Sequence, residues 1–221
     1  MKFEPKKRYL RFQKSVVIQH SLLTLSFIAL AVSGYKLYGY NMNPGIENYF
    51  LFRNVLSWNQ LHLAAGIFLS LAIIWHFLYI LFSIYGHNDF MQMVLSRKDF
   101  RTLAGFGFRK IYAAKERFGL QEKITYWVVG SYVVLMAITG ILRYAADFSN
   151  NYLPQSLYIL MLEFHGFQGL FLGIVLTVWH LYSIFLKPGR FPGTMSWWDG
   201  KISESELRSY NGHEKLEDQN K

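Results

Sequence analysis

Cysteine is absent from this chain of 221 residues, and charged residues are scarce. Without thiols the chain can form no disulfide, no cysteine-ligated iron–sulfur cluster, no catalytic thiolate and no covalent c-type haem attachment. Charged residues make up only 17% of the chain, whereas hydrophobic residues make up 52% and aromatic residues 18%. This composition is too apolar for an ordinary soluble domain, and it indicates a small membrane protein with a single domain.

Four apolar runs are long enough to cross a bilayer, and they predict an all-α, integral membrane four-helix bundle. The runs cover about residues 16–38, 59–85, 124–144 and 165–186. We therefore divide the chain into a basic segment 1–15, a four-span domain 16–187 and a tail 188–221.

Basic residues are distributed unevenly between the two ends of these spans. Of the 23 Lys and Arg residues, 20 precede the first span, separate the second from the third or follow the fourth, and only Lys36, Arg53 and Arg143 remain for the other side. By the positive-inside rule, both termini and the loop 86–123 are predicted to be cytoplasmic. We therefore expect the protein in a bacterial inner membrane, with the extracytoplasmic loops 39–58 and 145–164 in the periplasm. The net charge of +9 therefore reflects membrane topology and contact with lipid, and no nucleic acid is expected.

Histidines lie inside the apolar runs. Placing an imidazole in hydrocarbon costs free energy, so a histidine there is expected to have a function. His62 and His76 are 14 residues apart in one span, and His165 and His180 are 15 residues apart in another. At about 1.5 Å per residue these separations are about 21 and 22 Å, and both histidines of a span face a similar direction. Two such helices side by side would hold two haem b groups, each between two histidines.

The predicted topology assigns a depth to each of these histidines. His62 and His165 belong to the periplasmic side, whereas His76 and His180 belong to the cytoplasmic side, together with His20 of the first span. A zinc site is not expected, because no carboxylates lie near these histidines and the pairs are too far apart to share one ion.

Glycines follow two of the histidines at helical spacing. Gly66 lies four residues after His62, and Gly169 lies four residues after His165. Small residues on these faces would leave room for a macrocycle. Close helix packing through Gly169 and Gly173 is an equally good interpretation.

Five stretches follow one another in a specific order, although no single one is decisive: RFQKSVVIQHSLLTLSFIALAVSG, QLHLAAGIFLSLAIIWHFLYILF, EKITYWVVGSYVVLMAITGILRY, HGFQGLFLGIVLTVWHLYSIFLKPGRFPG and WWDGKISESEL. Through them nearly the whole chain resembles the cytochrome b (gamma) subunits of membrane-bound formate dehydrogenases and related four-helix dihaem cytochromes b. The resemblance implies two b haems, electron exchange with membrane menaquinone or ubiquinone, and a partner subunit that performs the substrate chemistry.

The related families imply two ligand sets that differ on the cytoplasmic side. Both assign His62 and His165 to the periplasmic-side haem. The formate dehydrogenase pattern pairs His180 with His20, whereas the pattern of quinol-oxidising bc-type cytochromes pairs His180 with His76. The spacing of 15 residues departs from the usual formate dehydrogenase spacing, so we prefer His76 and keep His20 as the alternative. The spare histidine is a candidate hydrogen-bond and proton partner for a quinone head group.

Basic side chains near the haem depths are candidates to pair with haem propionates. They are Arg8, Arg11 and Lys14 on the cytoplasmic side, and Arg53 and Arg143 on the other side. Contact with lipid headgroups is the simpler interpretation of each of these residues.

The expected function is transmembrane electron transfer between the quinone pool and a periplasmic redox subunit, either an iron–sulfur protein or a multihaem cytochrome c. The chain would then be the electron-transfer subunit of a quinone-linked oxidoreductase complex, with no catalytic residue of its own, rather than a stand-alone enzyme. Two alternatives stay open. One is a self-contained dihaem cytochrome b that reacts with superoxide or ferric iron, and the other is a haem-free membrane anchor.

Overall fold

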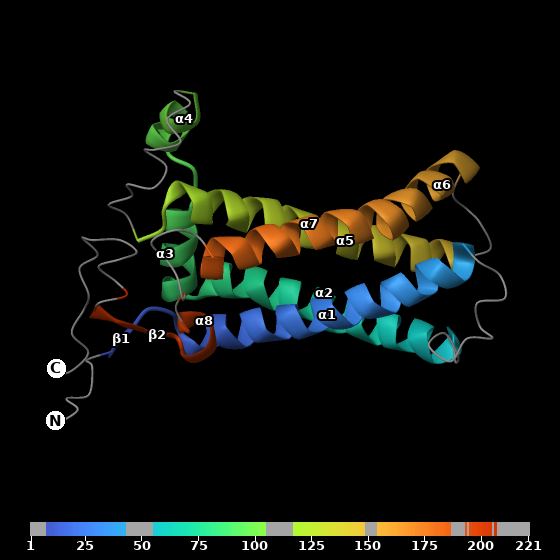
Figure 1. Cartoon of the computed structure of the whole chain (residues 1–221), viewed down its shortest axis with the longest axis horizontal. Coiled ribbons are helices and arrows are strands. Elements are labelled where there is room, and N and C mark those ends of the chain that lie inside the picture. Colours follow the sequence, from blue (N-terminus) through green and yellow to red (C-terminus); the bar gives the residue numbers. More distant parts are fainter. Residues whose placement is uncertain are drawn as a thin grey trace. The chain divides into compact units, whose positions relative to one another are not determined.

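The computed structural model describes residues 8–42, 55–104, 117–148, 154–186, 193, 195–204 and 206, and these are mostly helical (Figure 1). Within these residues, four helical segments are long and apolar enough to cross a membrane, namely Lys14–Gly39, Ser57–Phe82, Leu120–Ala146 and Gln155–Leu186. The prediction of four helices long and apolar enough to span a membrane is therefore confirmed.

The first three spans belong to single α-helices, α1 (Lys14–Met42), α2 (Val55–Phe82) and α5 (Leu120–Phe148). The fourth combines α6 (Gln155–Glu163), η3 (Phe164–Gln168), α7 (Gly169–Leu181) and η4 (Tyr182–Leu186), of which η3 and η4 have the wider π-helical turn. It begins ten residues before the predicted start at 165, because Glu163 interrupts an apolar run that continues on its other side. Its 32 residues make about 48 Å of helix, more than a hydrocarbon core of about 30 Å requires.

The second span ends earlier than predicted because a serine starts a new helix. Ser83 caps α3 (Ile84–Met93), and its hydroxyl accepts a hydrogen bond from the Gly86 amide at 3.4 Å. A Cβ on Gly86 would lie 2.3 Å from the carbonyl oxygen of Tyr79, so only glycine allows α3 to start so close to the end of α2. The apolar residues Ile84 and Tyr85, which extended the predicted run to 85, therefore belong to α3.

Two short strands bring distant parts of the chain together. β1 (Arg8–Leu10) pairs antiparallel with β2 (Lys201–Ser203), with Arg8 opposite Ser203. The preceding helix α8 (Ser196–Asp199) ends at Gly200, whose φ of 72° is in the left-handed region that favours glycine. Ile202 of β2 is fully buried. No sequence pattern indicated this pairing.

Two carboxylates outside the spans fix the connection between α2 and α5. Asp99 of α4 (Arg97–Ala104) accepts hydrogen bonds from the Ser96 amide and hydroxyl at 2.7 and 2.8 Å and from Lys123 Nζ at 3.0 Å. Burial acts to raise the pKa of Asp99, but these hydrogen bonds outweigh it and hold the pKa below its usual value. Asp89 pairs with Arg117 at 2.6 Å, and burial nevertheless raises the pKa of Asp89.

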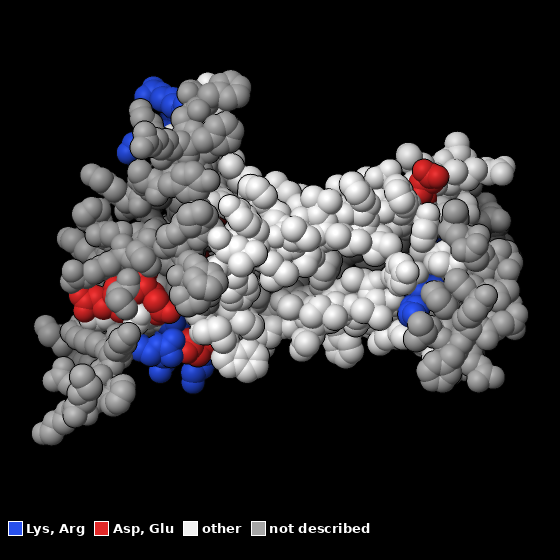
Figure 2. Space-filling model, viewed as in Figure 1, with Lys and Arg blue, Asp and Glu red and all other residues white. Residues whose placement is uncertain are grey.

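The side chains on the spans are largely apolar and exposed. Few residues of the spans are buried, and Leu25 and Phe82, for example, are 67% and 82% exposed. In the face shown in Figure 2, described charged side chains gather around α4 and around α8 with the two strands, while most of the spanning surface is uncharged. Such a surface suits hydrocarbon rather than water.

The chain divides into two compact units, and each takes part of every spanning segment. Unit 1 consists of Met1–His20, His76–Gly130 and Trp179–Lys221, and unit 2 consists of Ser21–Trp75 and Ser131–Val178. Each unit contains candidate ligands of its own, so the two sites are described separately.

Candidate functional site

In unit 2, His62 of α2 and His165 of η3 face each other. Their ring centroids are 6.1 Å apart, and their planes are nearly perpendicular, at 86°. Two imidazoles on opposite sides of one metal ion, each with a metal–nitrogen bond of about 2.0–2.1 Å and a ring centre about 1.1 Å further back, have centroids about 6.3 Å apart. The observed separation therefore leaves room for one metal ion bound by both histidines.

Hydroxyl groups fix the protonation of both imidazoles. Ser33 Oγ lies 2.9 Å from His62 Nδ1, and Thr139 Oγ1 lies 3.0 Å from His165 Nδ1. Each hydroxyl also donates to the carbonyl four residues earlier, at 2.6 Å for Ser33 and 2.9 Å for Thr139. The hydroxyl oxygens must therefore accept from Nδ1–H, which leaves Nε2 of each histidine unprotonated. That is the form in which imidazole binds a metal.

A glycine follows each hydroxyl residue and lets the imidazole approach the helix. A Cβ on Gly34 would lie 3.3 Å from His62 Cε1, and a Cβ on Gly140 would lie 2.9 Å from His165 Cε1. A hydroxyl–glycine dipeptide thus recurs in α1 and α5, each time facing the histidine of the following span. The sequence contains this signal, but it becomes recognisable only when the partners of the histidines are known.

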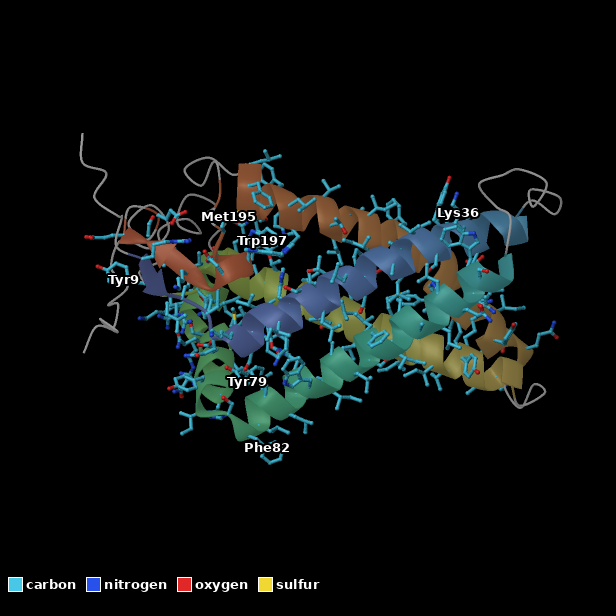
Figure 3. The ribbon with its side chains drawn as sticks, turned by 90° about the horizontal axis from the view of Figure 1, so that it is seen from below. Tyr9, Lys36, Tyr79, Phe82, Met195 and Trp197 are labelled. Atoms are coloured by element: carbon cyan, nitrogen blue, oxygen red, sulfur yellow. The ribbon has the colours of Figure 1, made fainter. Side chains whose placement is uncertain are left out.

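In unit 1, His20 of α1 and His180 of α7 form a second facing pair. Their ring centroids are 6.3 Å apart, with planes at 38°. The Nδ1 atoms of both are buried and have no hydrogen-bond partner among the described residues. Trp197 of α8 lies beside this pair, 6.4 Å from the His20 ring, and Figure 3 shows it next to the α1 ribbon. This separation also leaves room for one metal ion bound by both rings.

His76 of α2 differs from the paired histidines because both of its ring nitrogens have side-chain hydrogen-bond partners. Its Nδ1 lies 2.9 Å from Gln19 Oε1, and its Nε2 lies 3.1 Å from the hydroxyl of Tyr126. The structure therefore brings His180 together with His20, and not with the preferred His76. The preference for His76 rested on the spacing of 15 residues, and the wide turn of η3 accounts for that spacing because a π-helical turn takes up one additional residue.

A family model described as prokaryotic cytochrome b561 matches residues 11–195. The chain belongs to this family. Members are membrane cytochromes that bind b-type haem and transfer electrons, so haem b is the group that the facing imidazoles suit. The match supports a cytochrome b but does not single out the formate dehydrogenase gamma subunits. No curated protein matches the chain.

The propionate candidates of this cytochrome differ in their surroundings. In unit 1, Arg8 pairs with Asp199 at 2.6 Å, Arg11 is only 8% exposed, and Lys14 is exposed. The Arg8–Asp199 pair is partly exposed, so Arg8 already has a carboxylate partner at the surface.

In unit 2, Arg143 lies within electrostatic reach of both His62 and His165. It is therefore the candidate placed beside a facing histidine pair. Arg53, the other candidate for this side, lies outside the described residues.

The glycines near the histidines have different neighbours. A Cβ on Gly169 would lie 2.3 Å from Met136 Cε, and a Cβ on Gly173 would lie 2.7 Å from the Tyr132 hydroxyl. These two glycines serve close packing of α7 against α5. At Gly66 the nearest atom to an added Cβ would be 4.0 Å away, so space remains there.

Proposed function

We propose that this chain is a dihaem cytochrome b of the bacterial inner membrane that carries electrons between the quinone pool and a periplasmic redox subunit. The supporting observation is the pair of facing histidines in each unit, His62 with His165 and His20 with His180, at 6.1 and 6.3 Å between ring centroids. Bound haem b would supply a reversible one-electron carrier at each pair. Both termini would be cytoplasmic, which places the unit 1 pair toward the cytoplasm.

The protein residues around the pairs hold the ligands and exclude water. Ser33 and Thr139 keep Nε2 of His62 and His165 free for iron, and Arg143 supplies a positive charge for a propionate beside them. The surrounding spans expose apolar side chains to hydrocarbon. Without cysteine, the chain holds no thiolate-ligated centre. An iron–sulfur or multihaem cytochrome c partner would therefore carry the electrons further.

Because His20 faces His180, His76 is the remaining candidate for the histidine that binds the quinone head group and exchanges protons with it. Its imidazole donates from Nδ1 to Gln19 Oε1 and accepts at Nε2 from the Tyr126 hydroxyl, at 2.9 and 3.1 Å. Gln19 is 2% exposed, and its Nε2 has no hydrogen-bond partner among the described residues, so it is available to donate to a quinone carbonyl. Oxidation of one quinol releases two protons and two electrons. The Tyr126–His76–Gln19 chain would accept the protons, and haem b held by His20 and His180 would supply the one-electron chemistry.

Alanine substitution of each histidine tests this assignment. We expect H62A and H165A to lose one b haem each, H20A and H180A to lose the other, and H76A to keep both while losing reduction by quinol. Haem is counted by the pyridine haemochrome method, and turnover is followed as haem reduction after addition of a quinol analogue. His87→Ala, at an exposed position of α3, is the matched control.

Loss of a haem in H76A, or two haems retained in H20A, would contradict the pairing in unit 1. A purified protein with no b-type band would instead establish a haem-free anchor. Copurification of an iron–sulfur or multihaem subunit from native membranes is expected. An isolated chain that reacts with superoxide or ferric iron without any such subunit would refute the role of a partner.

A further inference from the structure

We infer that Ser33 and Thr139 are positioning residues that set the tautomer, the ring orientation and the reduction equilibrium of the haem site formed by His62 and His165. The inference rests on the proposed function, because it requires these two histidines to be axial ligands. It adds a role for two hydroxyl groups that touch neither iron nor substrate.

The number of available protons fixes the direction of these hydrogen bonds. Each hydroxyl has one proton, and the Ser33 proton is directed to the Ala29 carbonyl at 2.6 Å, as the Thr139 proton is to the Leu135 carbonyl at 2.9 Å. The contacts to the imidazoles, at 2.9 and 3.0 Å, can then only be Nδ1–H donating to oxygen. The Leu30 and Met136 carbonyls are second acceptors for the same two hydroxyl protons, at 3.3 and 3.2 Å.

A simpler explanation is that a hydroxyl in a membrane helix merely bonds to the preceding turn. Ser70 and Thr177 do this, with bonds of 2.8 and 2.7 Å to the Gly66 and Gly173 carbonyls, and no described imidazole is hydrogen-bonded to either hydroxyl. Ser33 and Thr139 make the same backbone bond and in addition accept from a histidine. This geometry occurs on two separate helices, each time beside a glycine that admits the ring, so it is more than ordinary back-bonding.

The chemical consequence is a more electron-rich Nε2 atom. An imidazole that donates from Nδ1 is a more basic ligand, and a more basic ligand favours the ferric over the ferrous state. Removing the hydroxyl should therefore make this haem easier to reduce. We expect a shift in the reduction equilibrium of about threefold for each single variant and about tenfold for both together, because one neutral hydrogen bond contributes about 1 kcal/mol or less. A tenfold change corresponds to 59 mV for a one-electron couple.

The experiment uses the full-length, haem-loaded protein in detergent and compares S33A, T139A and the double variant with the hydroxyl exchanges S33T and T139S. S70A and T177A are matched controls that lose only a backbone bond. Potentiometric titration resolves the two haems, and electron paramagnetic resonance of the ferric state reports the orientation of the imidazole planes. The haem of unit 1 serves as an internal reference in every sample.

The inference predicts a raised potential and altered resonance for one haem only in the alanine variants, with wild-type values in S33T, T139S, S70A and T177A. Both haems retained with unchanged potentials and resonances in the double variant would overturn it, as would an equal shift in the two controls. If an alanine variant loses this haem, recovery in the corresponding hydroxyl exchange supports the inference, and no recovery refutes it. Failure of the proposed function would be distinct, because the wild type would then lack a b-type band, or H62A and H165A would keep both haems.

Discussion

Gly140→Ala should selectively weaken one haem site, because the added methyl group meets a proposed iron ligand. The new Cβ would lie 2.9 Å from Cε1 of His165, whereas ordinary contacts begin at 3.4 Å, so the ring must retreat by about 0.5 Å, the difference between the two distances. Metal–ligand distances tolerate only about 0.2 Å. Overpacking of this kind costs about 1–3 kcal/mol, which corresponds to haem binding about 5- to 150-fold weaker.

Two other glycines turn this substitution into a graded series. A Cβ on Gly34 would lie 3.3 Å from His62 Cε1 and would require a shift of only about 0.1 Å, so G34A should retain its haem with a small spectral change. On the same helix as Gly140, a Cβ on Gly130 would meet nothing within 4 Å, so G130A should behave as wild type. The gain in helix propensity from Gly to Ala is common to all three variants and cancels in the comparison.

The assay is haem content per chain at limiting haem supply, measured by the pyridine haemochrome method together with reduced-minus-oxidised spectra. We expect about one haem per chain in G140A and about two in G34A, G130A and the wild type. Two fully occupied haems in G140A, with spectra identical to those of G130A, would refute the close contact between Gly140 and the ligand.

Three further predictions concern other parts of the molecule. Tyr126→Phe should keep both haems but slow their reduction by quinol, because His76 Nε2 loses its donor at 3.1 Å; an unchanged rate in stopped-flow measurements would exclude Tyr126 from the quinone site. Asp99 has a lowered pKa, so its contribution to stability is complete above the ordinary aspartate value of 3.8 and is lost as the pH falls through the lower folded-state pKa. The difference in melting temperature between wild type and D99N should therefore shrink as the pH falls below 3.8, and a difference that stays constant from pH 7 to pH 3 would contradict the lowered pKa. Since the chain has no cysteine, single K36C and K98C variants can be labelled with a membrane-impermeant maleimide; K36C should react in intact cells and K98C only after permeabilisation, and the opposite result would invert the topology.

The positions of the spans were predictable because they depend on local properties. A run of about twenty apolar residues has few alternatives to a membrane helix, and imidazoles within it stand out whatever their partners are. Helix ends were less predictable. The end of α2 is set by the Ser83 cap and by the close approach of Gly86 to Tyr79, neither of which changes hydropathy.

The pairing in unit 1 could not be predicted from spacing, because three imidazoles compete there for two positions. The spacing within the spans favoured His76, whereas the resemblance to formate dehydrogenase subunits implied His20. The π-helical turn of η3 and the side chains of Gln19 and Tyr126 separate them, and such features arise only when the helices are packed. The same holds for Ser33 and Thr139, which look like ordinary small polar residues until the histidine of the next span lies against them.

The pairing of β1 with β2 has a consequence for the order of events during synthesis. Arg8 and Ser203, which lie opposite each other, are separated by nearly the whole chain, and His20 and His180 of the same unit are almost as distant in sequence. The ribosome produces one partner of each pair long before the other. The contacts of unit 1 between β1 and β2 and between His20 and His180 can therefore form only after the last span has been synthesised. Until then His20 lies in the membrane without its partner histidine.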